Sequence, residues 1–212
     1  MYLPKIHEET RVEILHQLIH SHPLGTWVVL GEGELVANPI PFFIDSSRGE
    51  FGTLMAHVSR ANPVWDLPVS SVPSLVSFQG AQTYITPSWY PSKQEHGKAV
   101  PTWNYVVVQA QGVPRFIEDR EWLLAHVELL TQQHECKQEV QWKVKDVPDD
   151  YIERLLGAIV GVEIPIQQLT GKWKISQNRP EVDKKGIING LENNGDEHSL
   201  AVANWVRGTL GQ

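Results

Sequence analysis

Cysteine is nearly absent from this chain of 212 residues, and Cys136 is the only one, so no disulfide can form within the chain. Proteins of reducing compartments commonly lack disulfides. The first ten residues, MYLPKIHEET, also lack the apolar segment of a secretory signal peptide. We therefore expect a cytoplasmic protein.

Long apolar runs and an excess of positive charge are missing as well. No run reaches the roughly 18 apolar residues of a membrane span, and the longest, LLGAIVGVEIPI, includes Glu163. We therefore expect no membrane partner. The formal net charge is −7, so the surface as a whole repels phosphate backbones. This charge weighs against general nucleic-acid binding, although a local basic patch would still allow DNA as a partner.

Common catalytic and metal-binding motifs are not found. The chain has no serine nucleophile elbow, no Walker loop and no Gly-x-Gly-x-x-Gly motif, which leaves its catalytic residues unassigned. His16 and His20 stand one helical turn apart, but no cysteine or carboxylate completes a metal-binding set. A surface helix explains their spacing, and we predict no metal site.

The order of the periodic segments predicts a mainly β protein with peripheral helices. An amphipathic helix over 12–19 is followed by six short β-rich segments between residues 25 and 117, which predict an antiparallel barrel or sandwich. Helical spacing returns at 118–135, where Asp119 is the expected N-cap, and at 148–159. A strand pair over 162–176 precedes a polar helical tail that starts at Pro180.

The stretch MAHVSRANPVWDL is the first candidate site. A strand is predicted to end near residue 58, and the Asn-Pro pair at 62–63 is typical of a helix start, where free N–H groups attract anions. His57, Ser59 and Arg60 precede that start and offer donors to a phosphate. The alternative is an ordinary capped helix with a solvated arginine.

The stretch YITPSWYPSKQEHGKAVPTWNY, residues 84–105, is the second candidate site. It combines the rings of Trp89 and Trp103 with the charges of Lys93 and Lys98. Rings beside cations suit a flat, anionic ligand. A dimer interface is the alternative, because tryptophan and tyrosine are also enriched there.

The stretch GKWKISQNR, residues 171–179, is the third candidate site. In a strand, Lys172, Lys174 and Ser176 share one face. The dense donors that follow, Gln177, Asn178 and Arg179, suit a carbonyl-rich ring or a phosphate. A polar turn that leads into Pro180 is the alternative.

These three stretches, in this order, resemble the PaiB-type family of FMN-binding negative transcriptional regulators. The resemblance runs through nearly the whole chain. It is carried by the blocks MYLPKIHEE, HPLGTWV, ANPIPFF, GTLMAHVSRANPVW, FQGAQTYITPSWYPSK, VPTWNY, DYIERLLGAIVGVEIPI and LTGKWKISQNRP. Each block alone is a weak signal, whereas the ordered set is highly specific.

The resemblance implies a six-stranded antiparallel Greek-key split barrel, similar to pyridoxamine-phosphate oxidase, that forms a homodimer with FMN at the subunit interface. The barrel domain would cover residues 1–179 with inserted helices, and a helical tail over 180–212 would pack on or near it. Carried over by segment, the expected FMN contacts are Asn38, His57, Ser59, Arg60, Trp89, Lys93, Trp103, Lys174, Gln177, Asn178 and Arg179.

The resemblance leaves three functions open. The first is an FMN-binding repressor that acts through DNA or a regulatory partner, although Glu192, Asp196 and Glu197 crowd the turn of the tail where a DNA-reading helix needs cations. The second is an FMN-dependent oxidoreductase that uses NAD(P)H or a small-molecule substrate. The third is a haem protein in which His57, His96 or a tail histidine is the axial ligand.

Overall fold

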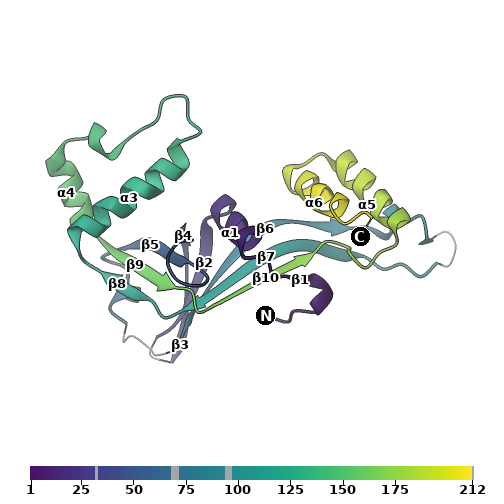
Figure 1. Ribbon diagram of the computed structural model, residues 1–212, viewed down its shortest axis with the longest axis horizontal. Helices are drawn as coiled ribbons and strands as arrows, with labels where there is room; N and C mark the ends of the chain where they lie inside the picture. Colours follow the sequence, from purple (N-terminus) through teal and green to yellow (C-terminus); the bar gives the residue numbers. More distant parts are fainter. Residues whose placement is uncertain (32, 68–71, 94–96, 212) are drawn as a thin grey trace. The chain divides into compact units, whose positions relative to one another are not determined.

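The chain forms two compact units, shown as ribbons in Figure 1. This computed structural model describes residues 1–31, 33–67, 72–93 and 97–211, so His96 lies outside the described residues. The first unit comprises Met1–Arg11, Gln79–Val108 and Thr170–Gln212, and the second comprises Val12–Phe78 and Gln109–Leu169. The strands β6 (Ser74–Ile85), β7 (Thr102–Gly112) and β10 (Gln168–Lys174) have residues in both.

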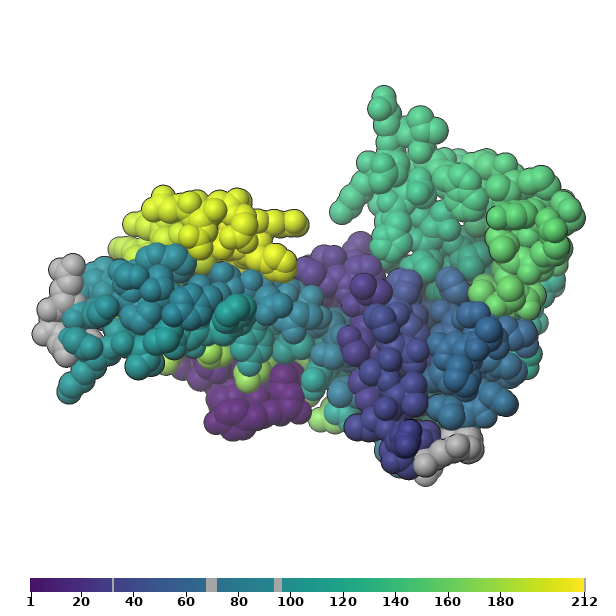
Figure 2. All heavy atoms as spheres, turned by 180° about the vertical axis from the view of Figure 1, so that it is seen from behind, coloured from purple at the N-terminus to yellow at the C-terminus, as the bar shows by residue number. Residues whose placement is uncertain are grey.

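Within its described residues, the first unit consists of sheet strands, two helices and short 3-10 turns. The strands lie in the order β1 (Glu8–Glu9), β10, β7 and β6, and Glu8 of β1 stands opposite Lys172 of β10 in an antiparallel pair. Short 3-10 turns, η1 (Lys5–His7) and η3 (Pro87–Trp89), precede β1 and follow β6. The helices α5 (Glu181–Asn194) and α6 (Glu197–Arg207), yellow in Figure 2, form one layer on the strands.

Local sequence signals explain how α5 gives way to α6. Gly195 follows α5 with a φ of 71°, a left-handed conformation that glycine adopts without strain. Asp196 then caps α6 by accepting hydrogen bonds from the backbone N–H and the hydroxyl of Ser199. The two helices pack against each other, with Ile187 and Leu191 of α5 and Val202 and Val206 of α6 buried.

Two antiparallel strand groups form the core of the second unit. In one, β2 (Leu24–Gly31) lies between β3 (Glu34–Pro41) and β6, with Trp27 opposite Asn38 and Val76. In the other, the order is β4 (Phe43–Asp45), β5 (Thr53–Ser59), β9 (Ile159–Pro165) and β8 (Arg115–Ile117). Alternation along β2 buries Trp27 and Val29, whereas β5 is buried along nearly its whole length because it is central and covered on both faces.

Helices cover this second unit. They are α1 (Val12–Ser21), α3 (Arg120–Glu135) and α4 (Asp149–Gly157), with the 3-10 turns η2 (Pro63–Trp65) and η4 (Val144–Asp146). Asp119 caps α3 by accepting the backbone N–H of Trp122 at 2.8 Å, as predicted. A Cβ atom on Gly161 of β9 would lie 2.3 Å from the Trp122 ring, so only glycine lets α3 pack this closely on the strand. None of the described helices is long and apolar enough to cross a membrane.

The structure confirms the mainly β, antiparallel class with peripheral helices, and it changes three details. Two of the six expected β-rich segments, 73–80 and 81–86, form the single strand β6, because Gly80 is buried within it and does not make a turn. Buried Phe42 separates β3 from β4. The helix start expected at Asn62 is the three-residue turn η2, although Asn62 does cap it. The division of the chain at residue 179 stays a prediction.

Candidate functional site

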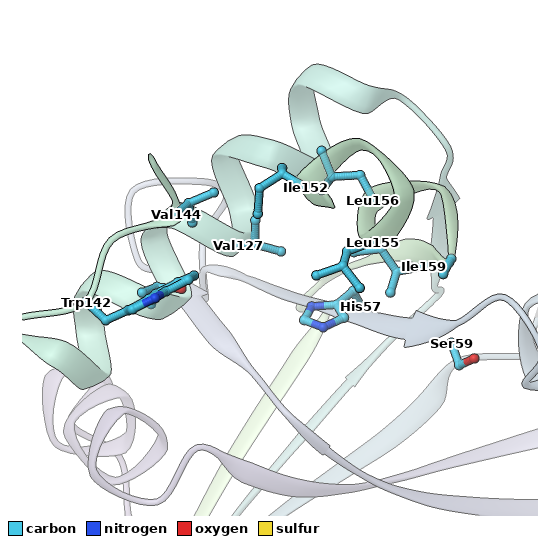
Figure 3. A pocket seen from close by; sticks show the side chains of 11 residues that line it. His57, Ser59, Val127, Trp142, Val144, Ile152, Leu155, Leu156 and Ile159 are labelled. Atoms are coloured by element: carbon cyan, nitrogen blue, oxygen red, sulfur yellow. The ribbon is translucent and has the colours of Figure 1, made fainter. Parts of the chain in front are cut away.

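A hollow of about 550 Å³ lies in the second unit between α3, η4 and α4 and the ends of β5 and β9 (Figure 3). Figure 3 shows His57 on the strand side, with Val127, Ile152 and Leu156 on the helices opposite. The described residues that line it are His57, Ser59, Val127, Thr131, Trp142, Val144, Ile152, Leu155, Leu156, Ala158 and Ile159. No side chain in this lining carries a full charge when its histidine is neutral.

His57 contacts a second imidazole behind the hollow. Its Nδ1 lies 3.2 Å from Nε2 of His126, and one of the two nitrogens must donate. His126 is fully buried and stacks on Trp122, with ring centroids 5.1 Å apart. Burial, together with the positive charge that His57 can carry, lowers the pKa of His126 to about 4, and burial also lowers the pKa of His57. Both rings are therefore neutral at physiological pH.

An ion pair between exposed Arg48 and buried Glu163 holds Trp122 in place. The indole Nε1 donates to Glu163 at 3.0 Å, and Arg48 binds the same carboxylate through two hydrogen bonds of 2.5 and 2.9 Å. The Arg48 guanidinium outweighs the burial of Glu163 and lowers the pKa of this carboxyl group. The chain of contacts from Arg48 to His57 thus fixes the imidazole that faces the hollow.

Arg60, predicted to bind phosphate, already has partners for its guanidinium. It donates to Glu118 at 2.6 Å, to the Gly157 carbonyl at 3.1 Å and to the Ile159 carbonyl at 3.4 Å. The guanidinium also lies over the ring of Trp65. In this arrangement Arg60 ties the start of β9 to the end of β5.

The other two predicted contacts of the second unit make local bonds. The Ser59 hydroxyl accepts the backbone N–H of Ala61 at 3.2 Å. Asn38 accepts a hydrogen bond from the Asn62 amide at 3.0 Å, while its own buried Nδ2 has no partner among the described residues. Of the four predicted residues in this unit, His57 and Ser59 share the hollow, and Asn38 and Arg60 do not line it.

Two lysines and an aromatic ring form a second site, in the first unit. The Nζ atoms of Lys172 and Lys174 lie 5.4 and 5.9 Å from the ring centroid of Tyr105. Lys172 is only 8% exposed, and Lys174 donates to the Trp103 carbonyl at 2.7 Å. Burial lowers the pKa of Lys174, and Lys172 adds to this effect. Within the described parts of the chain, neither lysine forms an ion pair.

His7 extends this lysine–tyrosine site. Its Nδ1 lies 3.3 Å from Oε1 of Gln177. Burial lowers the pKa of His7, and the charges of Lys172 and Lys174 lower it further. Three basic side chains therefore gather on one surface of the first unit, and neutral groups accept from both lysines.

A strained turn follows the two lysines. Ser176 is a buried non-glycine residue with a φ of 62°, and its hydroxyl bonds to the Asn104 amide at 3.0 Å. Backbone strain of this kind persists where surrounding contacts hold it, often at functional sites. Gln177 bonds to the Trp173 and Ile6 carbonyls, so it fastens the turn to the N-terminal segment.

The remaining predicted residues of the first unit are spread around this turn. Asn178 and Lys93 are exposed, and Trp103 is exposed with its indole N–H bonded to Gln82. The Arg179 guanidinium lies 4.6 Å from the ring centroid of buried Tyr90. Trp89 packs on α5, where added Cβ atoms on Gly186 and Gly190 would overlap it.

Sequence reasoning missed the importance of His126 and His7, whereas Tyr105 lies in the second candidate stretch, where its ring is one of those expected to stack on a flat ligand. The signal for His126 was its spacing from Trp122, which places both on one face of α3. Among the remaining haem candidates, His198 accepts the Gln82 backbone N–H at 3.2 Å. No cluster of histidine, cysteine and acidic side chains suited to a metal ion occurs in the described part of the chain.

Comparison with known proteins identifies a family and several relatives of this chain. The family described as "Putative FMN-binding domain" matches residues 1–168. The uncharacterized protein AN0679 of Emericella nidulans is 34% identical over 98% of this chain and 96% of its own length. The protease synthase and sporulation protein PAI 2 of Bacillus subtilis is 27% identical over 99% and 98%.

A solved structure also matches the fold. The FAD and heme binding protein of Mycobacterium smegmatis superposes with a TM-score of 0.58, at 17% identity, over 79% of this chain and 73% of that protein. At this identity the likeness concerns the fold alone. The architecture is the flavin split barrel predicted from the sequence.

Proposed function

The chain belongs to the FMN-binding domain family, and from this premise we propose that it is a homodimeric regulatory flavoprotein of the PaiB type, with FMN at the subunit interface. FMN is the cofactor of the family. The name of the Bacillus subtilis relative, a protease synthase and sporulation protein, supports a regulatory role for the bound flavin. When bound, FMN supplies redox chemistry, while the protein binds and orients it.

The observation that carries this proposal is the lysine–tyrosine site. Lys172 and Lys174 are positive charges on a half-buried surface beside the ring of Tyr105, and among the described residues neither forms an ion pair. A partly buried charge without an anion is costly in free energy. FMN would supply a phosphate for the lysines and a flat ring beside Tyr105. We assign Lys174 to the FMN phosphate, supported by Lys172 and by the donors of the turn at Gln177.

Arg60 is the weaker phosphate ligand, because it would have to leave Glu118 and two carbonyl groups before it could bind FMN. His57 is neutral in its apolar surroundings and brings no charge to an anion. Arg60 and Asn38 remain proposed FMN contacts, whereas His57 and Ser59 line the hollow instead.

Regulation through a partner protein fits the tail better than direct DNA reading. Lys184 is buried and donates to the Thr209 carbonyl, Lys185 lies 3.9 Å from Glu181, and Arg207 is paired with Glu192. The cations of α5 and α6 are thus committed within the tail, whereas DNA binding requires cations that are available to phosphates.

A flavin-dependent oxidoreductase is the second candidate. The hollow beside His57 is large enough for a small substrate, and it is the observation that favours this function. Oxidation of NAD(P)H by the FMN-loaded protein without oxygen would support the enzyme, and the absence of such oxidation would support the regulator.

The phosphate assignment is tested by comparing FMN with riboflavin, which lacks the phosphate, in calorimetric titrations. Lys174→Gln keeps donors for the Trp103 carbonyl but removes the charge. We expect it to weaken FMN binding by roughly 1.5–3 kcal/mol, about 10- to 150-fold, and to leave riboflavin binding unchanged. Lys185→Gln on α5 is the matched control. Arg60→Ala, titrated in parallel, should show the same loss only if Arg60 also binds the phosphate.

An equal loss of FMN and riboflavin affinity in Lys174→Gln would show damage to the fold or to the ring site and would refute the assignment. Unchanged FMN affinity in a folded Lys174→Gln protein would also refute it.

A further inference from the structure

The hollow of the second unit has the properties of a separate small-molecule site. Its volume of about 550 Å³ falls within the roughly 300–1,000 Å³ of typical ligand pockets. Trp142 and Leu155 line it and stay 43% and 47% exposed, although both are large and apolar. A ligand in the hollow would cover apolar surface that the chain leaves in water.

The lining determines which charge a ligand can carry. Among the described residues, no lysine, arginine, aspartate or glutamate lines the hollow, and both imidazoles are neutral. An ion would lose its hydration here without gaining a partner, which is costly. The hollow therefore selects an uncharged molecule, in contrast to the lysine–tyrosine site of the first unit.

The histidine pair determines whether His57 donates or accepts a hydrogen bond toward a ligand in the hollow. Nδ1 of buried His126 has no partner among the described residues. Buried N–H groups without a partner are rarer than under-satisfied acceptors, so the proton of His126 belongs on Nε2, which donates to Nδ1 of His57. The proton of neutral His57 then lies on its Nε2. Because His57 lines the hollow and its Nδ1 faces His126, this N–H is the donor available to a ligand.

We propose that this hollow binds an uncharged, mainly apolar molecule that carries a carbonyl or ring-nitrogen acceptor for His57 Nε2. Val127 and Leu156 pack on its faces, and Trp142 covers its outer edge. In a regulatory protein this molecule is an effector distinct from the FMN of the proposed function. The isoalloxazine ring of FMN also carries carbonyl and ring-nitrogen acceptors, so the experiment must distinguish a separate effector from FMN itself.

Chromone, a neutral bicyclic ketone, and naphthalene, a bicycle of similar shape without an acceptor, are the probes. Ligand-observed NMR titration of the full chain should show saturable binding of both, with chromone the tighter by roughly five- to tenfold, the usual value of one neutral hydrogen bond. In His57→Phe this preference should disappear while naphthalene still binds. Val127→Phe, which fills the hollow, should weaken both probes. His134→Phe, an exposed histidine on the same helix, should change neither.

FMN supplies the second arm of the test. If the site is separate, saturating FMN leaves the chromone affinity unchanged. Displacement of chromone by FMN would overturn the proposal, because the hollow would then hold the flavin ring. Absence of chromone binding, or a preference for chromone that survives in His57→Phe, would overturn it as well. Chromone binding that weakens as the protein concentration rises would show a second copy of the chain in the hollow, again against the proposal.

Discussion

At the scale of single residues, the two histidines behind the hollow make stability depend on pH. The folded pKa of His126 is about 4, against 6.5 for an unperturbed histidine. Between these values the unfolded chain binds the proton more readily than the folded one. The stability that His126 contributes is therefore complete above pH 6.5 and is lost as the pH falls toward 4. Because the pKa of His57 is also lowered, His57 acts in the same direction.

Denaturant unfolding at a series of pH values measures this effect. We expect the free energy of unfolding to fall by about 3 kcal/mol from pH 6.5 to 4, and His126→Phe to remove most of that fall. Carboxylates with lowered pKa values, such as Glu163, lose their contribution only below about pH 4.5. His134→Phe should keep the full dependence, and an identical slope in His126→Phe would contradict the assignment.

At the scale of elements, the close packing of α5 on Trp89 requires glycine at two positions of the helix. A Cβ atom on Gly190 would lie 2.3 Å from the indole ring, and one on Gly186 would lie 2.0 Å from the Trp89 carbonyl oxygen. Alanine in a helix normally stabilises by about 1 kcal/mol relative to glycine. Here we expect the overlap with the indole ring to outweigh that gain.

We expect Gly190→Ala to lower the free energy of unfolding by roughly 1–3 kcal/mol, the usual cost of overpacking. Gly157→Ala at the end of α4 is the matched control, since a Cβ there meets nothing within 4 Å. Chemical denaturation followed by far-UV circular dichroism compares the two variants. A neutral or stabilising Gly190→Ala would show that α5 does not rest on Trp89 as described.

Most elements could be predicted from the sequence because their signals are local. The apolar period of α1, the Asp119 cap of α3 and the alternation in β2 each lie within a few residues. The continuity of β6 through Gly80 could not be predicted, since it depends on neighbouring strands that bury the glycine.

The segments that form the candidate sites could be predicted from the sequence, but the contacts between residues of different segments could not. Lys172 and Lys174 stand out through strand alternation, whereas Tyr105 and His7 join them from other elements. Likewise, Arg60 in the sequence looks like a free donor, and only the fold brings Glu118 to it. The pairing of His57 with His126 requires α3 to pack on β5, which no local pattern specifies.

At the scale of the whole molecule, FMN binding and dimer formation should depend on each other. A ligand bound between two subunits stabilises the dimer by mass action, so FMN should draw the chain toward the dimeric state. The family match and the split-barrel fold make FMN the ligand, while the interface location and the dimer are our proposal.

Sedimentation velocity of the purified protein with and without added FMN tests this most directly, with detection at a visible wavelength that flavin absorbs. We expect flavin absorbance to sediment with a species of twice the 24.0 kDa chain mass, at one FMN per chain. Flavin that stays at the meniscus under excess FMN, or that sediments with a monomer, would contradict the central claim.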